Sequence, residues 1–148
     1  QQQARATGQE TISEISSGVK VMAAKGKTNS SPAVENIDLI VRPYAGTRGI
    51  NLENTVIQYK SSYEVLHLTE NDTLNGDVFT VTKLQNVSGT GGAQLQTMGD
   101  IAKVTIQPNT SLGASESATV TFYPSSGFKT VYGISIPPTL EETAWYEL

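Results

Sequence analysis

The spacing of apolar residues along the chain changes near residue 18. Before it, apolar and small residues recur at steps of three and four, which is the period of one helix face. From residue 19 onward, apolar and polar residues alternate in short runs, which is the period of a β-strand. The pattern therefore predicts one amphipathic helix followed by a β-rich domain.

The helix is predicted over residues 1–17, which contain no proline and many helix-tolerant Gln, Ala and Glu residues. Ser16-Ser17-Gly18 then supplies a stop, because glycine readily takes the left-handed conformation after a last helical turn. The apolar stripe along this helix is narrow and contains only Ala and Gly in its first half. We therefore expect the helix to need a partner. Its members are Ala4, Gly8, Ile12, Ile15 and Val19.

Eight later segments have strand-type sequences separated by turn-rich stretches. Asn75-Gly76 is a strong signal for a two-residue hairpin. No helical pattern separates the segments, so parallel β-α-β units are not expected. We predict a mainly β fold, an antiparallel immunoglobulin-like β-sandwich or barrel preceded by the end of an N-terminal α-helix. The predicted strands lie at residues 19–24, 37–43, 55–59, 63–68, 78–84, 101–107, 118–123 and 130–136.

Composition narrows the class of protein. The 148 residues are enough for about one domain, and without cysteine there are no disulfides, thiol nucleophiles or cysteine zinc sites. No apolar stretch approaches the roughly 18 residues of a membrane helix. The net charge is -4 and the ten Lys and Arg are scattered along the sequence. Since nucleic-acid binding normally needs a clustered basic surface, nucleic acid is not expected as a partner.

Candidate catalytic residues do not form a convincing set. His67 is the single histidine, and no nucleophile motif such as G-x-S-x-G accompanies it, so we interpret it as a strand residue at or near the surface. Glu141 and Glu142 could be a glycosidase pair only if they faced each other across a cleft. We predict no catalytic or cofactor-binding residue. Five aromatic residues could stack on sugars but are more often core or cross-strand residues: Tyr44, Tyr59, Tyr63, Tyr123 and Trp145.

The segment from Glu70 to Asp77 is rich in oxygen ligands and could bind Ca²⁺. Leu74 interrupts the alternation that a calcium loop needs, and the flanks have strand patterns. A solvated hairpin loop is therefore the better interpretation, with Asp72 and Asp77 kept as candidate ligands of a structural divalent cation.

Four N-x-S/T sequons are present, where eight asparagines and the Ser/Thr content would give about two by chance. All four lie in predicted turns or at strand ends, where a bulky glycan has room. We expect N-glycosylation at Asn29, Asn71, Asn86 and Asn109 in an extracellular setting.

Several blocks of the sequence resemble archaellins, the subunits of the archaeal swimming filament. The opening has a Gln- and Ala-rich stretch that leads through an Ala-Thr-Gly, a Glu-Thr and a Ser-Ser-Gly into the first strand. The resemblance covers almost the whole chain, with Asn51 where the family usually has Asp. Its blocks are Ala6-Thr7-Gly8, Glu10-Thr11, Ser16-Ser17-Gly18, Ile37 to Gly46, Gly49 to Leu52, Gly99-Asp100-Ile101 and Gly133 to Leu140.

The resemblance implies a structural, extracellular filament subunit and no enzyme. Residues 1–18 would be the C-terminal end of the filament-core helix, and residues 19–148 the outer β-domain. Ala4 and Gly8 would allow close helix packing, while Ile12 and Ile15 would anchor the helix end. The implied partners are further copies of itself, other archaellins and N-glycans. A membrane would be contacted only before assembly, through the long apolar segment that archaellins carry upstream and that is nearly all missing here, so we expect a trimmed piece.

Some archaellins carry an acidic metal-binding loop before the Gly-Asp block. Residues 84–88 have no carboxylate at that place, which leaves Asp100 as the remaining candidate ligand there. Two alternatives stay open for the function: a pilin-like adhesion subunit, and a carbohydrate-binding β-sandwich module.

Overall fold

The computed structural model describes residues 18–44, 49–71, 76–85, 89, 94–95, 99–125 and 128–148. Within these residues the chain forms eleven strands and the short 3-10 helix η1 (Leu52–Asn54). The strands are β1 (Val19–Thr28), β2 (Val34–Pro43), β3 (Ile50–Asn51), β4 (Val56–Ser61), β5 (Val65–Glu70), β6 (Val78–Gln85), β7 (Gln94–Leu95), β8 (Ile101–Ile106), β9 (Ser117–Tyr123), β10 (Thr130–Ser135) and β11 (Trp145–Glu147).

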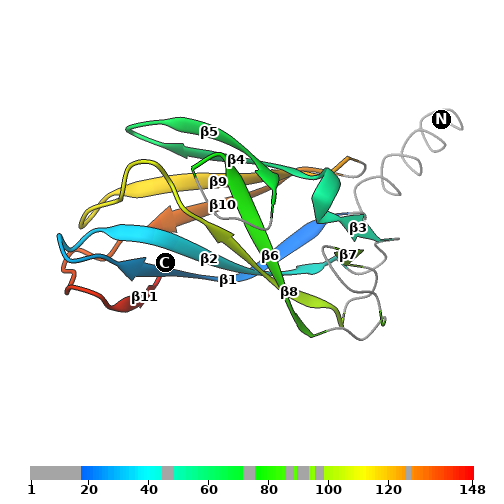
Figure 1. Ribbon diagram of the computed structural model, residues 1–148, viewed down its shortest axis with the longest axis horizontal. Coiled ribbons are helices and arrows are strands. Elements are labelled where there is room, and N and C mark those ends of the chain that lie inside the picture. The colour runs from blue at the N-terminus through cyan, green and yellow to red at the C-terminus, as the bar shows by residue number, and fades with distance from the viewer. Residues whose placement is uncertain are drawn as a thin grey trace, which may run out of the picture.

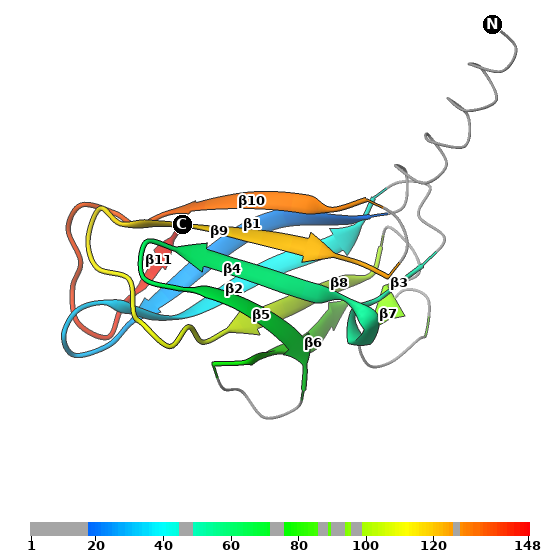
Figure 2. The ribbon, with the colours of Figure 1, turned by 90° about the horizontal axis from the view of Figure 1, so that it is seen from above.

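Nine of these strands form one curled sheet in the order β10-β9-β4-β5-β6-β8-β2-β1-β11. The sheet folds over on itself, so that β10, β9, β4 and β5 form one layer and the other five strands form the second (Figures 1 and 2). The curl brings β10 beside β1, where the Thr130 hydroxyl donates a 2.6 Å hydrogen bond to the Val19 carbonyl. The prediction of a mainly β, antiparallel sandwich or barrel is confirmed.

Alternation along the strands builds the core between the two layers. In β8, every second residue is buried, because successive side chains of a strand point to opposite faces. Each fully buried aliphatic or aromatic side chain contributes about 1.5–3 kcal/mol to folding. The largest fully buried side chains are Tyr59, Phe79, Phe122, Ile37, Leu39, Leu52, Ile57, Leu68, Leu95, Ile106, Leu112 and Ile134.

A β-bulge interrupts the alternation of β1. The register with β2 shifts between Val21 and Ala23, so Met22 is an extra residue and 45% of it is exposed. After the bulge it is Ala24, and not Ala23, that lies in the core. A bulge of this kind moves the following side chains of a strand to the opposite faces.

The predicted hairpin at Asn75-Gly76 is wrong. β5 and β6 are neighbours but run parallel, with Thr69 paired to Val78 and Glu70 to Phe79. A two-residue hairpin can join only antiparallel strands. This short parallel contact is where the chain passes from one layer to the other (Figure 2).

Each of the eight predicted strand segments coincides with an observed strand, whereas β3, β7 and β11 were not predicted. The predicted helix over residues 1–17 lies outside the described residues, and the division into segments 1–18 and 19–148 stays a prediction. In the part of the chain that the structure describes, no helix is long and apolar enough to cross a membrane.

Candidate functional site

The asparagines of three of the four sequons are among the described residues. Asn29 follows β1 and is half-buried, with its Oδ1 accepting 3.0 Å hydrogen bonds from the backbone N–H groups of Ser31 and Ala33. Asn71 follows β5 and is exposed. Asn86 lies outside the described residues. Asn71 is thus more exposed to solvent than Asn29.

Asn109 is exposed in the connection between β8 and β9, and its side chain lies directly against Gly76. A Cβ atom on residue 76 would meet the Asn109 amide, which would then have to move away. Asn109 therefore packs onto the connection that begins with Asn71. Two of the sequons thus border the same connection between β5 and β6.

The candidate metal ligands do not form a cluster in the described residues, where no group of three His, Asp or Glu side chains could hold an ion. Asp77 is exposed, whereas Asp100 is fully buried with its Oδ2 3.6 Å from the Lys83 Nζ. A lysine at this place competes with a metal ion for the same carboxylate. Asp72 lies outside the described residues, so the cation site stays a prediction.

The residues expected to pack in the filament also lie outside the described part of the chain. They are Ala4, Gly8, Ile12 and Ile15. The described structure begins immediately before β1, whose first residue, Val19, is fully buried in the core.

His67 and the aromatic side chains do not form a binding platform. His67 is exposed on β5 beside Gln58, in agreement with its interpretation as a surface strand residue. Tyr59 is buried in the core, and Tyr44 tilts against Phe128 with 5.3 Å between ring centroids. Because Tyr59 and Tyr44 serve packing in separate places, these two rings do not favour a carbohydrate-binding module, whereas Tyr63, Tyr123 and Trp145 are exposed.

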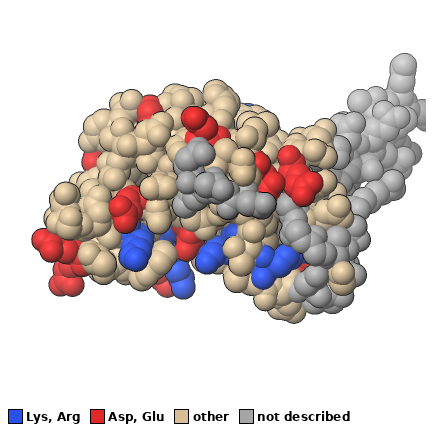
Figure 3. Space-filling model, viewed as in Figure 1, with Lys and Arg blue, Asp and Glu red and all other residues tan. Residues whose placement is uncertain are grey.

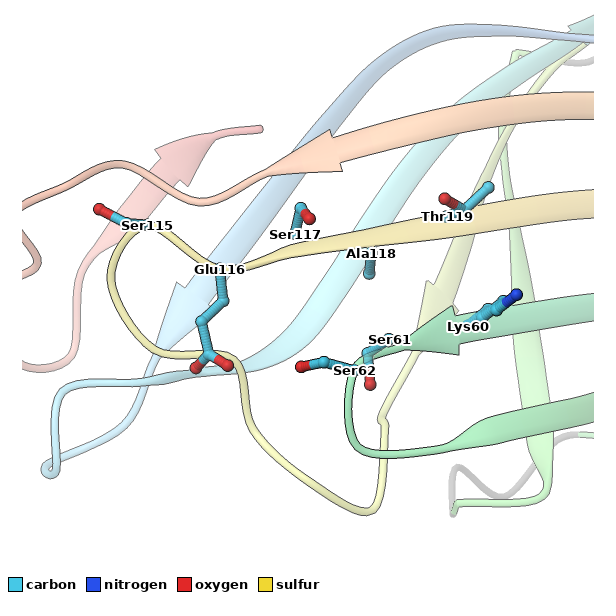
Figure 4. A pocket seen from close by; sticks show the side chains of 8 residues that line it. All are labelled: Lys60, Ser61, Ser62, Ser115, Glu116, Ser117, Ala118 and Thr119. Atoms are coloured by element: carbon cyan, nitrogen blue, oxygen red, sulfur yellow. The ribbon is translucent and has the colours of Figure 1, made fainter.

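A hydroxyl-rich hollow of about 390 Å³ lies at one end of β4 and β9 (Figure 4). Glu116 is its acidic residue, but its carboxylate already accepts a 2.6 Å hydrogen bond from the Gly113 N–H. A hydrogen bond to Glu116 also raises the pKa of Tyr63. Glu116 thus holds the loop in place. The lining residues are Lys60, Ser61, Ser62, Ser115, Glu116, Ser117, Ala118 and Thr119.

The outer surface of the second layer carries a cluster of basic residues, called the basic face below. The pairings of β1, β2 and β8 place Lys20 opposite Arg42, Lys25 opposite Asp38, and Lys103 opposite Ile40. Figure 3 shows Lys and Arg side chains following one another across this layer. The basic face consists of Lys20, Lys25, Lys27, Arg42 and Lys103.

A second hollow, of about 330 Å³, lies on the basic face between Lys25, Lys103, Ile40 and Trp145. Asp38 also lines it, is 9% exposed, and accepts a 2.8 Å hydrogen bond from the Thr105 hydroxyl. Two lysines and one carboxylate thus line the hollow, and Glu147 of β11 lies opposite Lys25. The arrangement can therefore accept an anionic group beside an aromatic surface.

The basic residues are scattered along the sequence, but the fold gathers five of them on one face. The sequence contained one signal for this. Lys20 has an even number whereas Lys25 and Lys27 have odd numbers, so strict alternation would place Lys20 on the opposite face of β1. The bulge at Met22 turns all three side chains to the same side. The expected absence of nucleic acid as a partner rested partly on that scatter and stays a prediction, with the net charge of -4 in its favour.

Comparison with known proteins gives consistent similarities. A family model described as archaeal-type flagellin matches residues 1–134. Flagellin A2 of Halobacterium salinarum is 28% identical over 149 residues, an alignment that covers 96% of the chain and 75% of that protein.

Two solved structures have a similar fold. Archaeal flagellin FlaB1 from Methanocaldococcus jannaschii superposes with a TM-score of 0.80 at 17% identity, covering 88% of this chain and 96% of the other. The archaeal flagellum subunit of Methanospirillum hungatei gives a TM-score of 0.66 at 14% identity, covering 96% and 79%. At these identities the likeness concerns the fold alone.

Proposed function

Because the chain belongs to the archaeal-type flagellin family, we propose that it works as a structural subunit of the archaeal motility filament. The single observation that carries this function is the family match, which runs from residue 1 through most of the β-domain. The curled sheet agrees with it, since the same fold occurs in the flagellin of Methanocaldococcus jannaschii. The role is mechanical, and the family membership implies no catalysis.

In this proposal the residues before β1 polymerise with their counterparts in neighbouring subunits, and the β-domain lies on the outside of the filament. The narrow stripe of Ala4, Gly8, Ile12 and Ile15 supports this, because its small residues, Ala4 and Gly8, allow helices to approach closely. Identical subunits joined head to tail by a contact that does not close build a helical filament. The subunit is then extracellular, and its partners are other copies and other flagellins.

We also propose that the β-domain carries N-linked glycans. The exposed Asn71 and Asn109 are the best placed acceptors among the described sequons, and both border the connection between β5 and β6. Glycans there would shield polar loops of the filament surface. Glycopeptide mass spectrometry of the native protein tests this, and unmodified asparagine at all four sequons would refute it.

The experiment for the main function is expression of the natural full-length subunit in an archaeal strain that lacks its own flagellins. We expect filaments that an antibody against this β-domain labels along their whole length in electron micrographs, and restored swimming. A subunit that is exported but forms no filaments, alone or together with other flagellins, would contradict the proposal.

A further inference from the structure

We infer that the hollow on the basic face is a docking site for the acidic loop of a second copy of this chain. The acidic loop is the 136–144 connection between β10 and β11, which carries Glu141 and Glu142. This inference rests on the proposed filament function and names the contact between neighbouring β-domains. The outcomes below separate its failure from failure of that function.

The hollow offers cations that are not already used. Neither Lys25 nor Lys103 has an ion-pair partner among the described residues. Asp38 is the one carboxylate that lines the hollow, and it is held by Thr105. A carboxylate that enters between the two lysines meets two ammonium groups and the Asp38 carboxylate, while Glu147 lies opposite Lys25 on β11.

The walls of the hollow fit a glutamate side chain. Trp145 is 54% exposed and its ring lies beneath the Lys27 ammonium, 6.0 Å from the ring centroid. Ile40 supplies a second apolar surface at the hollow. The methylene groups of a glutamate can contact these surfaces while its carboxylate reaches the lysines, and large exposed aromatic residues are typical of interface centres.

The acidic loop presents its carboxylates on a fixed backbone. The Thr28 hydroxyl donates a 2.6 Å hydrogen bond to the Glu141 carbonyl and accepts one of 2.8 Å from the Ala144 N–H. The Glu141 N–H donates a 2.7 Å hydrogen bond to the Tyr146 hydroxyl. Both Glu141 and Glu142 are exposed and have no ion-pair partner among the described residues. A loop that is already ordered loses little conformational entropy when it binds.

Docking of the acidic loop of one copy on the basic face of the next, repeated along a row of copies, is a head-to-tail contact. A head-to-tail contact that does not close builds a helical filament. Charge complementarity also selects the partner. The chain has a net charge of -4, and a neighbouring copy brings fixed glutamates to the cationic hollow.

The test is a charge exchange in the full-length subunit, expressed in the flagellin-free strain. Lys25→Glu with Lys103→Glu should lower the number of filaments per cell by about tenfold, because like charges then meet across the contact. Glu141→Lys with Glu142→Lys should do the same. The four changes combined should restore filaments to within about threefold of the unaltered subunit, since both signs are exchanged.

The matched control is Lys60→Glu with Lys129→Glu, which makes the same change of charge at exposed residues outside the basic face. This control should assemble normally. Thermal unfolding of each purified variant shows whether its β-domain is intact. A double variant that is folded and assembles normally would overturn the docking site, as would failure of the four combined changes to restore filaments.

Two further outcomes are decisive. If even the unaltered subunit is exported without forming filaments, the proposed function fails and the contact fails with it. If the Lys25→Glu/Lys103→Glu variant assembles normally but loses binding to a heparin column that retains the unaltered chain, the basic face serves an anionic polysaccharide. That result would overturn docking of a second copy while leaving the filament function in place.

Discussion

Among single residues, Asp100 is a buried charged residue whose stability depends on an ion pair with Lys83. Its side chain is fully buried, and the Lys83 ammonium 3.6 Å away is 12% exposed. Taking two charges out of water is costly, and removal of one leaves the other without compensation. Substitution of either Asp100 or Lys83 alone is therefore expected to destabilise the fold.

We predict that Asp100→Asn lowers the free energy of unfolding by about 3 kcal/mol, because it removes the buried carboxylate that lies 3.6 Å from the Lys83 ammonium. Urea denaturation of the purified chain measures this. Adding Lys83→Met to Asp100→Asn should recover part of the loss, since it also removes the mostly buried ammonium group. Glu142→Gln, at an exposed residue, serves as the control and should change stability by less than about 0.5 kcal/mol. Equal effects of the Asp100 and Glu142 changes would contradict the assignment.

Tyr59 gives the fold a dependence on alkaline pH. Burial raises the pKa of its phenol well above the ordinary value of 10.0, and the nearby Glu64 carboxylate raises this pKa further. The unfolded chain releases this proton above about pH 10, whereas the folded chain retains it. The stability is therefore fully present below pH 10 and is lost as the pH rises toward the folded pKa.

We predict that the free energy of unfolding falls more steeply for the unaltered chain than for Tyr59→Phe above about pH 10. The difference between them should grow by about 1.4 kcal/mol between pH 8 and pH 11. Urea unfolding at these pH values measures it. Tyr123→Phe removes an exposed phenol and should leave the steep decline unchanged. Parallel curves for Tyr59→Phe and the unaltered chain would show that Tyr59 ionises equally in both states.

At the scale of elements, β1 depends on a close approach at Gly26. A Cβ atom at this position would lie 2.8 Å from both the Val34 Cγ1 and the Leu148 Cδ1. Real Cβ atoms do not come this close, so β2 or the end of the chain would have to move. Gly133 in β10 is the natural comparison, because a Cβ there meets nothing within 4 Å.

We predict that Gly26→Ala lowers the free energy of unfolding by about 1–2 kcal/mol through this overpacking. Gly133→Ala should leave it unchanged or raise it by about 0.5 kcal/mol, because alanine restricts the unfolded chain more than glycine does. Thermal unfolding of the two variants in parallel measures both effects. If Gly133→Ala proved the more harmful, the packing around Gly26 described above would be wrong.

The periodicity of the sequence predicted the long strands but not their connections. A strand such as β8 shows its alternation over six residues, whereas β3 and β7 have only two residues each and contain no period to detect. The parallel contact of β5 and β6 was missed because Asn75-Gly76 is a local turn signal, while the pairing is decided by how the whole sheet curls. Local sequence could not report that curl.

The same limit applies to the candidate functional surface. Strict alternation along β1 would place Lys20 and Lys25 on opposite faces, and the bulge at Met22 brings them to the same face. Lys103 and Arg42 reach the same face through the pairing of distant strands. Family resemblance identified the type of protein from short sequence blocks. Prediction of the basic face would have required the register of β1, β2 and β8.

At the scale of the whole molecule, all buried members of the described hydrophobic core lie between residues 19 and 136. Its members come from both layers and end at Val19 on the N-terminal side and at Ile136 on the C-terminal side. Leu148 packs against this core from outside, and its N–H donates a 2.9 Å hydrogen bond to the Ala24 carbonyl. A core of this kind is expected to fold as one cooperative unit.

We predict that deleting residues 1–17 changes the midpoint of thermal unfolding by less than about 2 °C, because the core begins at Val19. Deleting residues 144–148 should instead lower it by about 5–10 °C, since this removes β11, the Ala144 bond to Thr28 and the cover of Leu148 over Gly26. Calorimetry of the three chains measures both effects. A large loss on removal of residues 1–17 would mean that the β-domain depends on that segment for folding. Retained stability would show that the segment is free to serve contacts between subunits.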